Sequence, residues 1–155
     1  MVIRELRIQR RRLLVMCKTE DIPFINSAKM LAKDSTCVRY KVGAVIVKNK
    51  QVLGAGHNRS PIVNEKCTEI GCAKDVGMPC RGTHAEINTI IDAASNHSEE
   101  KIQGATLFCT FSPCYACAKQ IIAVGIKRII YLQEYEKEPE VFDLLERAGI
   151  EIIKI

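Results

Sequence analysis

Two short segments of the sequence carry side chains that could bind a metal ion and use it for chemistry. One is Thr83-His84-Ala85-Glu86, and the other places Cys114 and Cys117 directly after Ser112-Pro113. Two thiols three residues apart project from one face of a helical turn, and a helix N-terminus favours the thiolate form that binds metal. Together with His84 they provide three nitrogen and sulfur ligands, the number that a catalytic zinc site uses while a fourth position stays open to water. The spacing therefore predicts a catalytic Zn2+ site.

Glu86 lies two residues beyond His84, close enough to face that open position without binding the metal. A carboxylate placed there can take a proton from water and return it to a leaving amine, so Glu86 is the predicted catalytic residue. A Cys-x-x-Cys pair alone also fits a redox motif or half of a structural zinc site. His-x-Glu together with Pro-Cys-x-x-Cys is the signature of zinc-dependent deaminases, which favours deamination over those alternatives.

The hydrophobic pattern indicates the elements that must hold these segments. Apolar spacing predicts a first helix from Asp21 to about Lys33, and two apolar runs around Lys48-Asn49-Lys50 predict a hairpin. The second half alternates strands with helices, which is typical of parallel pairing in an α/β domain. The predicted strands are 42–47, 51–55, 105–110, 127–132 and 150–153, and the later helices are 85–94, 114–124 and 141–148.

Residues 58–83 differ from the rest of the chain, because they show neither a helical nor a strand period. They contain Gly, Pro and three Cys. An irregular loop of this length inside a compact domain needs an additional stabilising interaction to hold it in one conformation.

The length and composition limit the class of protein. A chain of 155 residues accommodates one compact domain, and 47% apolar with 26% charged residues excludes wholesale disorder. The longest apolar runs span four or five residues, far short of a membrane span. No secretory signal opens the sequence, so we expect a cytoplasmic protein. In that reducing compartment, eight cysteines favour metal binding over disulfides.

The net charge of +5 is confined to an N-terminal arm. Residues 1–18 hold six basic side chains and one acidic side chain, whereas residues 19–155 hold seventeen of each sign. We therefore expect a basic arm at 1–18 and a neutral catalytic domain at 19–155, which is a poor groove for a nucleic acid backbone. The arm fits a helix extension, an oligomer contact, a nucleic-acid-binding arm or an organelle-targeting stretch. Initiation at Met16 is a further alternative, because recognisable domain sequence begins only after it.

Beyond the two chemical segments, the sequence resembles the cytidine/deoxycytidylate deaminase superfamily and, within it, the deoxycytidylate (dCMP) deaminase branch. The similarity covers roughly residues 20–155, nearly the whole domain. The matching segments are Ser35-Thr36-Cys37-Val38-Arg39, Val42 to Val47, Gly56-His57-Asn58-Arg59-Ser60-Pro61, Thr83 to Asn88, Gly104 to Leu107, Ser112 to Lys119 and Gly125-Ile126-Lys127. The Ser-Thr-Cys and Asn-x-Ser-Pro segments narrow the resemblance to the nucleotide branch.

The resemblance implies an α/β fold, a three-layer α/β/α sandwich around a five-stranded mixed sheet. It implies zinc-dependent hydrolysis of dCMP to dUMP and ammonia, with Glu86 moving protons between water, ring nitrogen N3 and the departing amine. It places Asn58 at the sugar, and the backbone amide of Ala85 and the carbonyl of Ser112 at the base edge. It also implies a homo-oligomer, either a hexamer or a smaller closed assembly. The expected ligand is a small nucleotide, and we expect neither a nucleic acid nor a membrane as a partner.

Two positions depart from the family pattern. The family usually has Tyr where His57 stands and Gly where Arg59 stands. Members that respond to dCTP and dTTP use that glycine-bearing region, so Arg59 argues against the same regulation here. We interpret His57 as a strand-end residue, Arg59 as a solvated loop residue or a phosphate contact, and His97 as an exposed residue of a polar loop.

Two other functions stay open at this point. The same chemistry serves other substrates, including cytidine, guanine, a pterin or an adenosine in RNA, and the neutral domain disfavours the RNA. A catalytically inactive zinc module in an assembly or a DNA-uptake machine is the second alternative, because a fold does not fix a function. The intact set of predicted zinc ligands and Glu86 argues against it.

The remaining cysteines suggest a second, structural zinc ion. Cys109 fits a buried strand and Cys17 belongs to the arm. The four others, one near the end of the first helix and three in the 58–83 loop, are Cys37, Cys67, Cys72 and Cys80. Four thiolates are the complement of a closed structural zinc site, and a metal would supply the ordering energy that the loop cannot gain by burial. Some deoxycytidylate deaminases resemble this arrangement at Cys37 and Cys67, whereas reduced thiols in a mobile loop, or a disulfide, are the alternatives.

Overall fold

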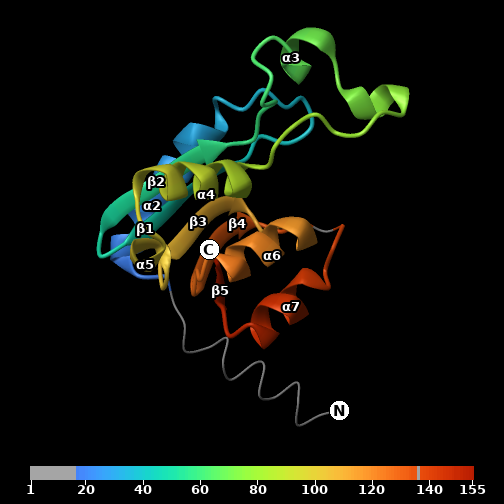
Figure 1. Ribbon diagram of the computed structural model, residues 1–155. Helices are drawn as coiled ribbons and strands as arrows, with labels where there is room; N and C mark the ends of the chain where they lie inside the picture. The colour runs from blue at the N-terminus through green and yellow to red at the C-terminus, as the bar shows by residue number, and fades with distance from the viewer. Residues whose placement is uncertain (1–16, 136) are drawn as a thin grey trace, which may run out of the picture.

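The computed structural model describes residues 17–135 and 137–155. Residues 1–16, which include most of the predicted basic arm and the alternative start at Met16, lie outside the described residues, so those expectations stay predictions. In the described chain, five strands form one sheet in the order β2-β1-β3-β4-β5 (Figure 1). The strands are β1 (Gly43–Lys48), β2 (Gln51–His57), β3 (Thr106–Phe111), β4 (Arg128–Gln133) and β5 (Glu151–Lys154).

The sheet is mixed, as the family resemblance implies. Strand β1 pairs antiparallel with β2 and β3, while β3–β4 and β4–β5 are parallel. The β1–β2 hairpin turns at Asn49 and Lys50, which adopt φ values of +52° and +63°, and a turn of this kind matches the right-handed twist of the strands. The parallel pairs are joined by crossover helices α6 (Tyr115–Ala123) and α7 (Val141–Arg147). The predicted hairpin and the predicted parallel pairing are therefore confirmed.

Helix α2 (Ile22–Ala32) covers one face of the sheet. Its buried residues Ile25 and Ala28 pack in one cluster with Val45 of β1. A Cβ atom at Gly43 would lie 2.1 Å from the carbonyl oxygen of Ala28, so only glycine permits this close approach of helix and strand.

The other face carries α4 (Ala85–Asn96) and α5 (Glu99–Ile102) together with α6 and α7 (Figure 1). Ala44 and Ile46 alternate with Val45 along β1, and they belong to the core on this second face. The three-layer α/β/α sandwich is thus confirmed. Helix α5 was not predicted, because four residues are too few to show a helical period. No helix in the described part of the chain is both long and apolar enough to cross a lipid bilayer.

A buried ion pair connects the segment before α2 to strand β4. The carboxylate of Asp21, at the end of the 3-10 turn η1 (Thr19–Asp21), accepts two hydrogen bonds of 2.9 Å from the guanidinium of Arg128. Arg128 also pairs at 2.9 Å with Glu151 of β5. Burial alone would raise the pKa of Asp21, but the hydrogen bonds from Arg128 and the Lys18 backbone outweigh it and lower the pKa.

Residues 60–82, here called the insertion, extend from one end of the sheet (Figure 1). Their base is closed by Arg59 and Thr83, which exchange backbone hydrogen bonds of 3.1 and 2.8 Å. The prediction that this stretch lacks helix is wrong, because it forms α3 (Cys67–Ile70) and the 3-10 turn η2 (Ala73–Val76). Both are single turns ended by glycines with positive φ, so neither leaves a period in the sequence.

Candidate metal centre and active site

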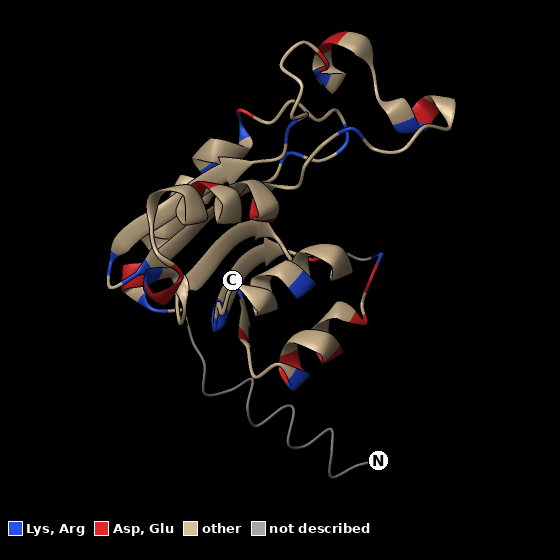
Figure 2. Cartoon of the chain, viewed as in Figure 1, with Lys and Arg blue, Asp and Glu red and all other residues tan. Residues whose placement is uncertain are grey.

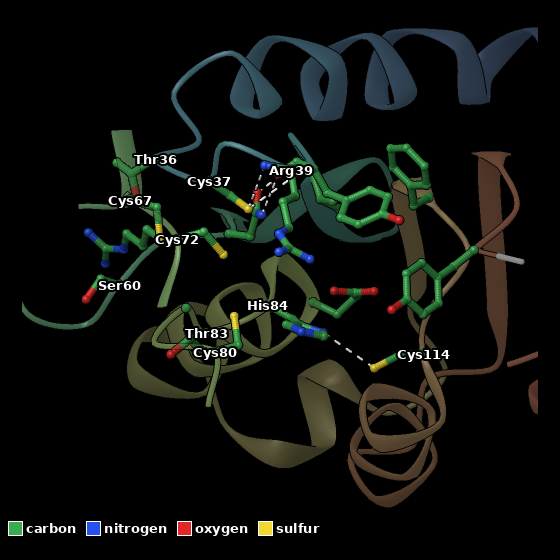
Figure 3. A pocket seen from close by; sticks show the side chains of 18 of the residues that line it. Thr36, Cys37, Arg39, Ser60, Cys67, Cys72, Cys80, Thr83, His84 and Cys114 are labelled. Carbon is green, nitrogen blue, oxygen red and sulfur yellow. Dashed lines mark hydrogen bonds between the residues drawn. The ribbon is translucent and has the colours of Figure 1, made fainter. Parts of the chain in front are cut away.

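The three predicted catalytic zinc ligands lie together in space. Nδ1 of His84 lies 3.4 Å from Sγ of Cys114 and 3.4 Å from Sγ of Cys117, and Figure 3 shows His84 pointing toward Cys114. All three ligand atoms lie within 4.8 Å of one another. His84 is the N-cap residue of α4 and Cys114 is the N-cap residue of α6, as the sequence predicts.

The local structure favours a thiolate at Cys114. Hydrogen bonds from Cys117, whose backbone amide lies 3.5 Å from Sγ of Cys114, and from His84 lower the pKa of the Cys114 thiol to about 4. The pKa of Cys117 is raised, because its thiol donates to Cys114 and is buried. The contact with Cys114 also raises the pKa of His84. Two nearly buried sulfurs and one imidazole nitrogen that is exposed toward the pocket are a donor set that fits zinc with one open position.

Glu86 is buried at 4% exposure and lines the same pocket as His84 and Cys114. Burial raises the pKa of its carboxyl to about 7. A group with this pKa both accepts and donates a proton near neutral pH, which is the property of an efficient general acid–base catalyst. The geometry therefore agrees with the role that the sequence predicts for Glu86.

The predicted substrate contacts lie around this centre. Asn58 and Ser112 are buried residues that line the pocket. Ala85 is fully buried as the first residue of α4, so its backbone amide belongs to the orphan donors of a helix N-terminus. Their contacts with base and sugar stay predictions.

Asn58 also has a structural role, because its side chain binds backbone groups of a neighbouring loop. Its Oδ1 accepts a 2.9 Å hydrogen bond from the amide of Val42, and its Nδ2 donates at 2.7 Å to the carbonyl of Tyr40. The Asn58 carbonyl also accepts from the hydroxyl of Ser35 at 3.1 Å. Asn58 thus fixes the loop before β1, and within the described part of the chain its second amide N–H has no partner and is available to a ligand.

Three aromatic side chains form one wall of the pocket, which was not predicted from the sequence. Tyr40, Phe111 and Tyr135 come from three separate segments, and the ring centroid of Tyr40 lies 5.8 Å from each of the other two. Lys137 lies over the ring of Tyr40, with Nζ 5.7 Å from its centroid. Aromatics make up only 5% of the chain, but their convergence depends on tertiary structure and left no pattern in the sequence.

The four thiols of the predicted second zinc site line the same pocket. Cys67 and Cys72 are buried, Cys37 is half-buried and Cys80 is exposed (Figure 3). Among the described residues, only His84, Cys114 and Cys117 form a group of three with ligand atoms within 4.8 Å of one another, so the second site stays a prediction.

The remaining histidines lie outside this centre. His57 is the last residue of β2, which confirms its interpretation as a strand-end residue. Burial lowers the pKa of its imidazole. His97 is half-buried, so its interpretation as an exposed residue is wrong: it is the C-cap residue of α4, and its backbone amide donates to the carbonyl of Ala93.

The described fold and site agree with known proteins. Residues 18–133 match the family described as the cytidine and deoxycytidylate deaminase zinc-binding region. The chain belongs to this family. It is 33% identical over 132 residues to ComE operon protein 2 of Bacillus subtilis (strain 168), covering 85% of this chain and 69% of that protein. It is 32% identical over 167 residues to the deoxycytidylate deaminase of Enterobacteria phage T2, covering 83% of this chain and 88% of that protein.

A solved structure gives the same assignment. The dCMP deaminase from the cyanophage S-TIM5, crystallised in complex with dCMP and dUMP, is similar with a TM-score of 0.76 and 34% identity. The similarity covers 90% of this chain and 100% of that chain. The protein is therefore a zinc-dependent deaminase of the dCMP deaminase branch, and His84, Cys114 and Cys117 form a group that could hold its zinc.

Proposed function

We propose that the protein hydrolyses dCMP to dUMP and ammonia. The observation that carries the proposal is the placement of a buried carboxyl, Glu86, in one pocket with His84 and Cys114, which together with Cys117 form a group that could hold zinc. Relatives named as deoxycytidylate deaminases, and a similar structure solved with dCMP and dUMP, support this substrate.

In the proposed reaction, water attacks C4 of the cytosine ring, and the bond from C4 to the amino nitrogen breaks. His84, Cys114 and Cys117 would hold a zinc ion, and this ion would supply Lewis-acid activation of that water. Glu86 takes a proton from the attacking water and delivers it to ring nitrogen N3. It then takes a second proton from the hydroxyl now bound to C4 and transfers it to the amino group, which leaves as ammonia, so that the ring keeps the oxygen as a carbonyl. A carboxyl with a pKa of about 7 suits both directions of transfer.

The pocket offers groups that position the substrate for this reaction. In the proposal, the remaining N–H of Asn58 donates to the sugar. The backbone amide of Ala85 donates to the base edge, and the carbonyl of Ser112 accepts from the amino group of the base. These contacts would orient C4 toward the zinc site, and orientation is a large part of enzymatic rate acceleration.

Two further features belong to the proposal. A second zinc would bind Cys37, Cys67, Cys72 and Cys80 and hold the insertion beside the pocket.

The protein would also form a homo-oligomer. Light scattering at several concentrations tests this, since a strictly monomeric species would contradict it.

A substrate panel tests the proposed reaction. Ammonia release is measured with dCMP, CMP, dCTP, deoxycytidine and guanine at equal concentrations, and dCMP should give the highest kcat/KM. A preference for guanine or for a free nucleoside would instead assign the same chemistry to another substrate.

A zinc module without catalytic activity is a second candidate, because one relative, ComE operon protein 2, is not named as a deaminase. Such a protein would bind zinc at His84, Cys114 and Cys117 and release no ammonia from any member of the panel. The buried Glu86 favours the enzyme. Burying a carboxyl lowers the stability of the fold, and a catalytic role accounts for a carboxyl at this position whereas a purely structural role does not.

A further inference from the structure

The aromatic wall of the pocket carries a cation that the proposed chemistry does not use. Lys137 lies with Nζ 5.7 Å from the ring centroid of Tyr40, which is close enough for a cation–π contact. The ring of Tyr40 also makes T-shaped contacts with the rings of Phe111 and Tyr135. The contact fixes the position of the ammonium group but leaves its N–H donors for another partner.

The loop that carries Lys137 is anchored on both sides to the turn that holds Cys114. Before the lysine, the backbone amide of Tyr135 donates at 2.7 Å to Oγ of Ser112. After it, the carboxylate of Glu138 accepts at 2.5 Å from the backbone amide of Tyr115. Ser112 and Tyr115 flank the metal-binding residue, so the position of Lys137 is set relative to the zinc site.

The charges of the pocket favour an anionic ligand. The lining residues include four cations, Arg39, Arg59, Lys74 and Lys137, and one carboxylate, that of Glu86. Figure 2 shows basic residues in the loops at the base of the insertion. Because the domain is neutral as a whole, this local excess gives the pocket a positive potential that attracts an anion.

The cations of the pocket differ in their surroundings. Arg39 already pairs with Asp75 of η2. Lys74 belongs to the insertion, and Arg59 forms its base. Among the described residues, Arg59, Lys74 and Lys137 make no ion pair with a carboxylate, and Lys137 is the one of these three on a loop anchored to the Cys114 turn.

We propose that Lys137 determines specificity for a nucleotide over a nucleoside by pairing with the 5′-phosphate of the substrate. Tyr40 is a positioning residue that holds the lysine through its ring. This inference rests on the proposed function, because it assumes that the base of the same nucleotide lies at the zinc site.

Steady-state kinetics with dCMP and deoxycytidine test the proposal. Lys137→Met should raise KM for dCMP by about tenfold or more, the usual scale for losing a charged hydrogen bond, with kcat nearly unchanged. The kinetic parameters for deoxycytidine should not change, since that substrate lacks the phosphate. Lys137→Arg should keep most of the preference for dCMP. Lys127→Met, an exposed lysine at the opposite end of β4, is the matched control and should behave like the wild type.

Tyr40 is tested by a double-mutant cycle. Tyr40→Leu should raise KM for dCMP in the presence of Lys137 and have little further effect in the Lys137→Met background. An equal effect in both backgrounds, or an equal effect on deoxycytidine, would assign Tyr40 to folding or to base binding and overturn its positioning role.

Calorimetric binding of dUMP and deoxyuridine separates this inference from the proposed reaction. Lys137→Met should weaken dUMP binding and leave deoxyuridine binding unchanged, whatever the rate of deamination. If the wild type deaminates dCMP but Lys137→Met leaves both KM and dUMP affinity unchanged, the assignment of Lys137 is wrong while the proposed function stands. A wild type that binds neither dCMP nor dUMP would overturn both.

Discussion

Nδ1 of His84 lies 3.4 Å from Sγ of Cys114, although 30 residues separate them in the chain. The contact joins the first residues of two helices, α4 and α6, which lie on the same face of the sheet. Both helix N-termini therefore direct their partial positive charge at one place. The thiolate of Cys114 is favoured at this place, and the buried carboxyl of Glu86 lies in the same pocket.

His84→Ala should remove the catalytic zinc, because two sulfurs alone leave the metal with half of a tetrahedral ligand set. Metal analysis of protein purified without chelator should show one zinc equivalent fewer per chain than in the wild type. His97→Ala changes a histidine outside the pocket and should keep the full amount. Full zinc retention in His84→Ala would remove this residue from the ligand set.

Glu86→Gln should keep the zinc and lower kcat by at least about a hundredfold, the usual scale for a general acid–base group. The amide preserves the shape of the buried side chain but cannot shuttle protons at neutral pH. Glu99→Gln, on the surface of α5, is the control for loss of a carboxylate. Turnover close to the wild-type rate in Glu86→Gln would contradict the proton-transfer role.

Asp21→Asn should lower the free energy of unfolding by about 2 to 3 kcal/mol, the scale for a buried hydrogen bond to a charged group. Asp21 is 5% exposed, and Arg128 loses one of its two carboxylate partners in this variant. Urea unfolding at neutral pH measures the difference, and Asp143→Asn on the surface of α7 should change stability far less.

The same pair predicts a dependence on pH. The pKa of Asp21 is lower in the folded protein than its ordinary value of 3.8, so the stability from its ionised form is fully present above that value. It is lost as the pH falls through the folded-state pKa. The stability difference between wild type and Asp21→Asn should therefore shrink in acid, and a difference that grows below pH 4 would contradict the assignment.

The sequence was sufficient to predict the sheet and the convergence of His84, Cys114 and Cys117, since both depend on local patterns. Periodicity located the strands around Val45, and helix-start chemistry located His84 and Cys114. The aromatic wall was not predictable, because the contact of Tyr40 with Tyr135 depends on how separate loops converge. The short helices of the insertion were missed for a different reason, since one turn is shorter than the window in which a helical period can be detected.

Cys67→Ser tests the predicted structural zinc. Wild-type protein purified without chelator should contain close to two zinc equivalents, and the variant should contain close to one and unfold at a lower temperature. Cys17→Ser, a change outside the pocket, should leave both values unchanged. One equivalent in the wild type, with Cys67 alkylated readily in the native protein, would show that these thiols hold no metal.

The most direct test of the account is the conversion of dCMP by the zinc-loaded protein, followed by chromatography of the nucleotides and by ammonia measurement. We expect dUMP and ammonia in equal amounts, loss of activity on removal of zinc by a chelator and its return when zinc is added back. A protein that contains the catalytic zinc, is folded and leaves dCMP unchanged at micromolar enzyme concentrations would contradict the account.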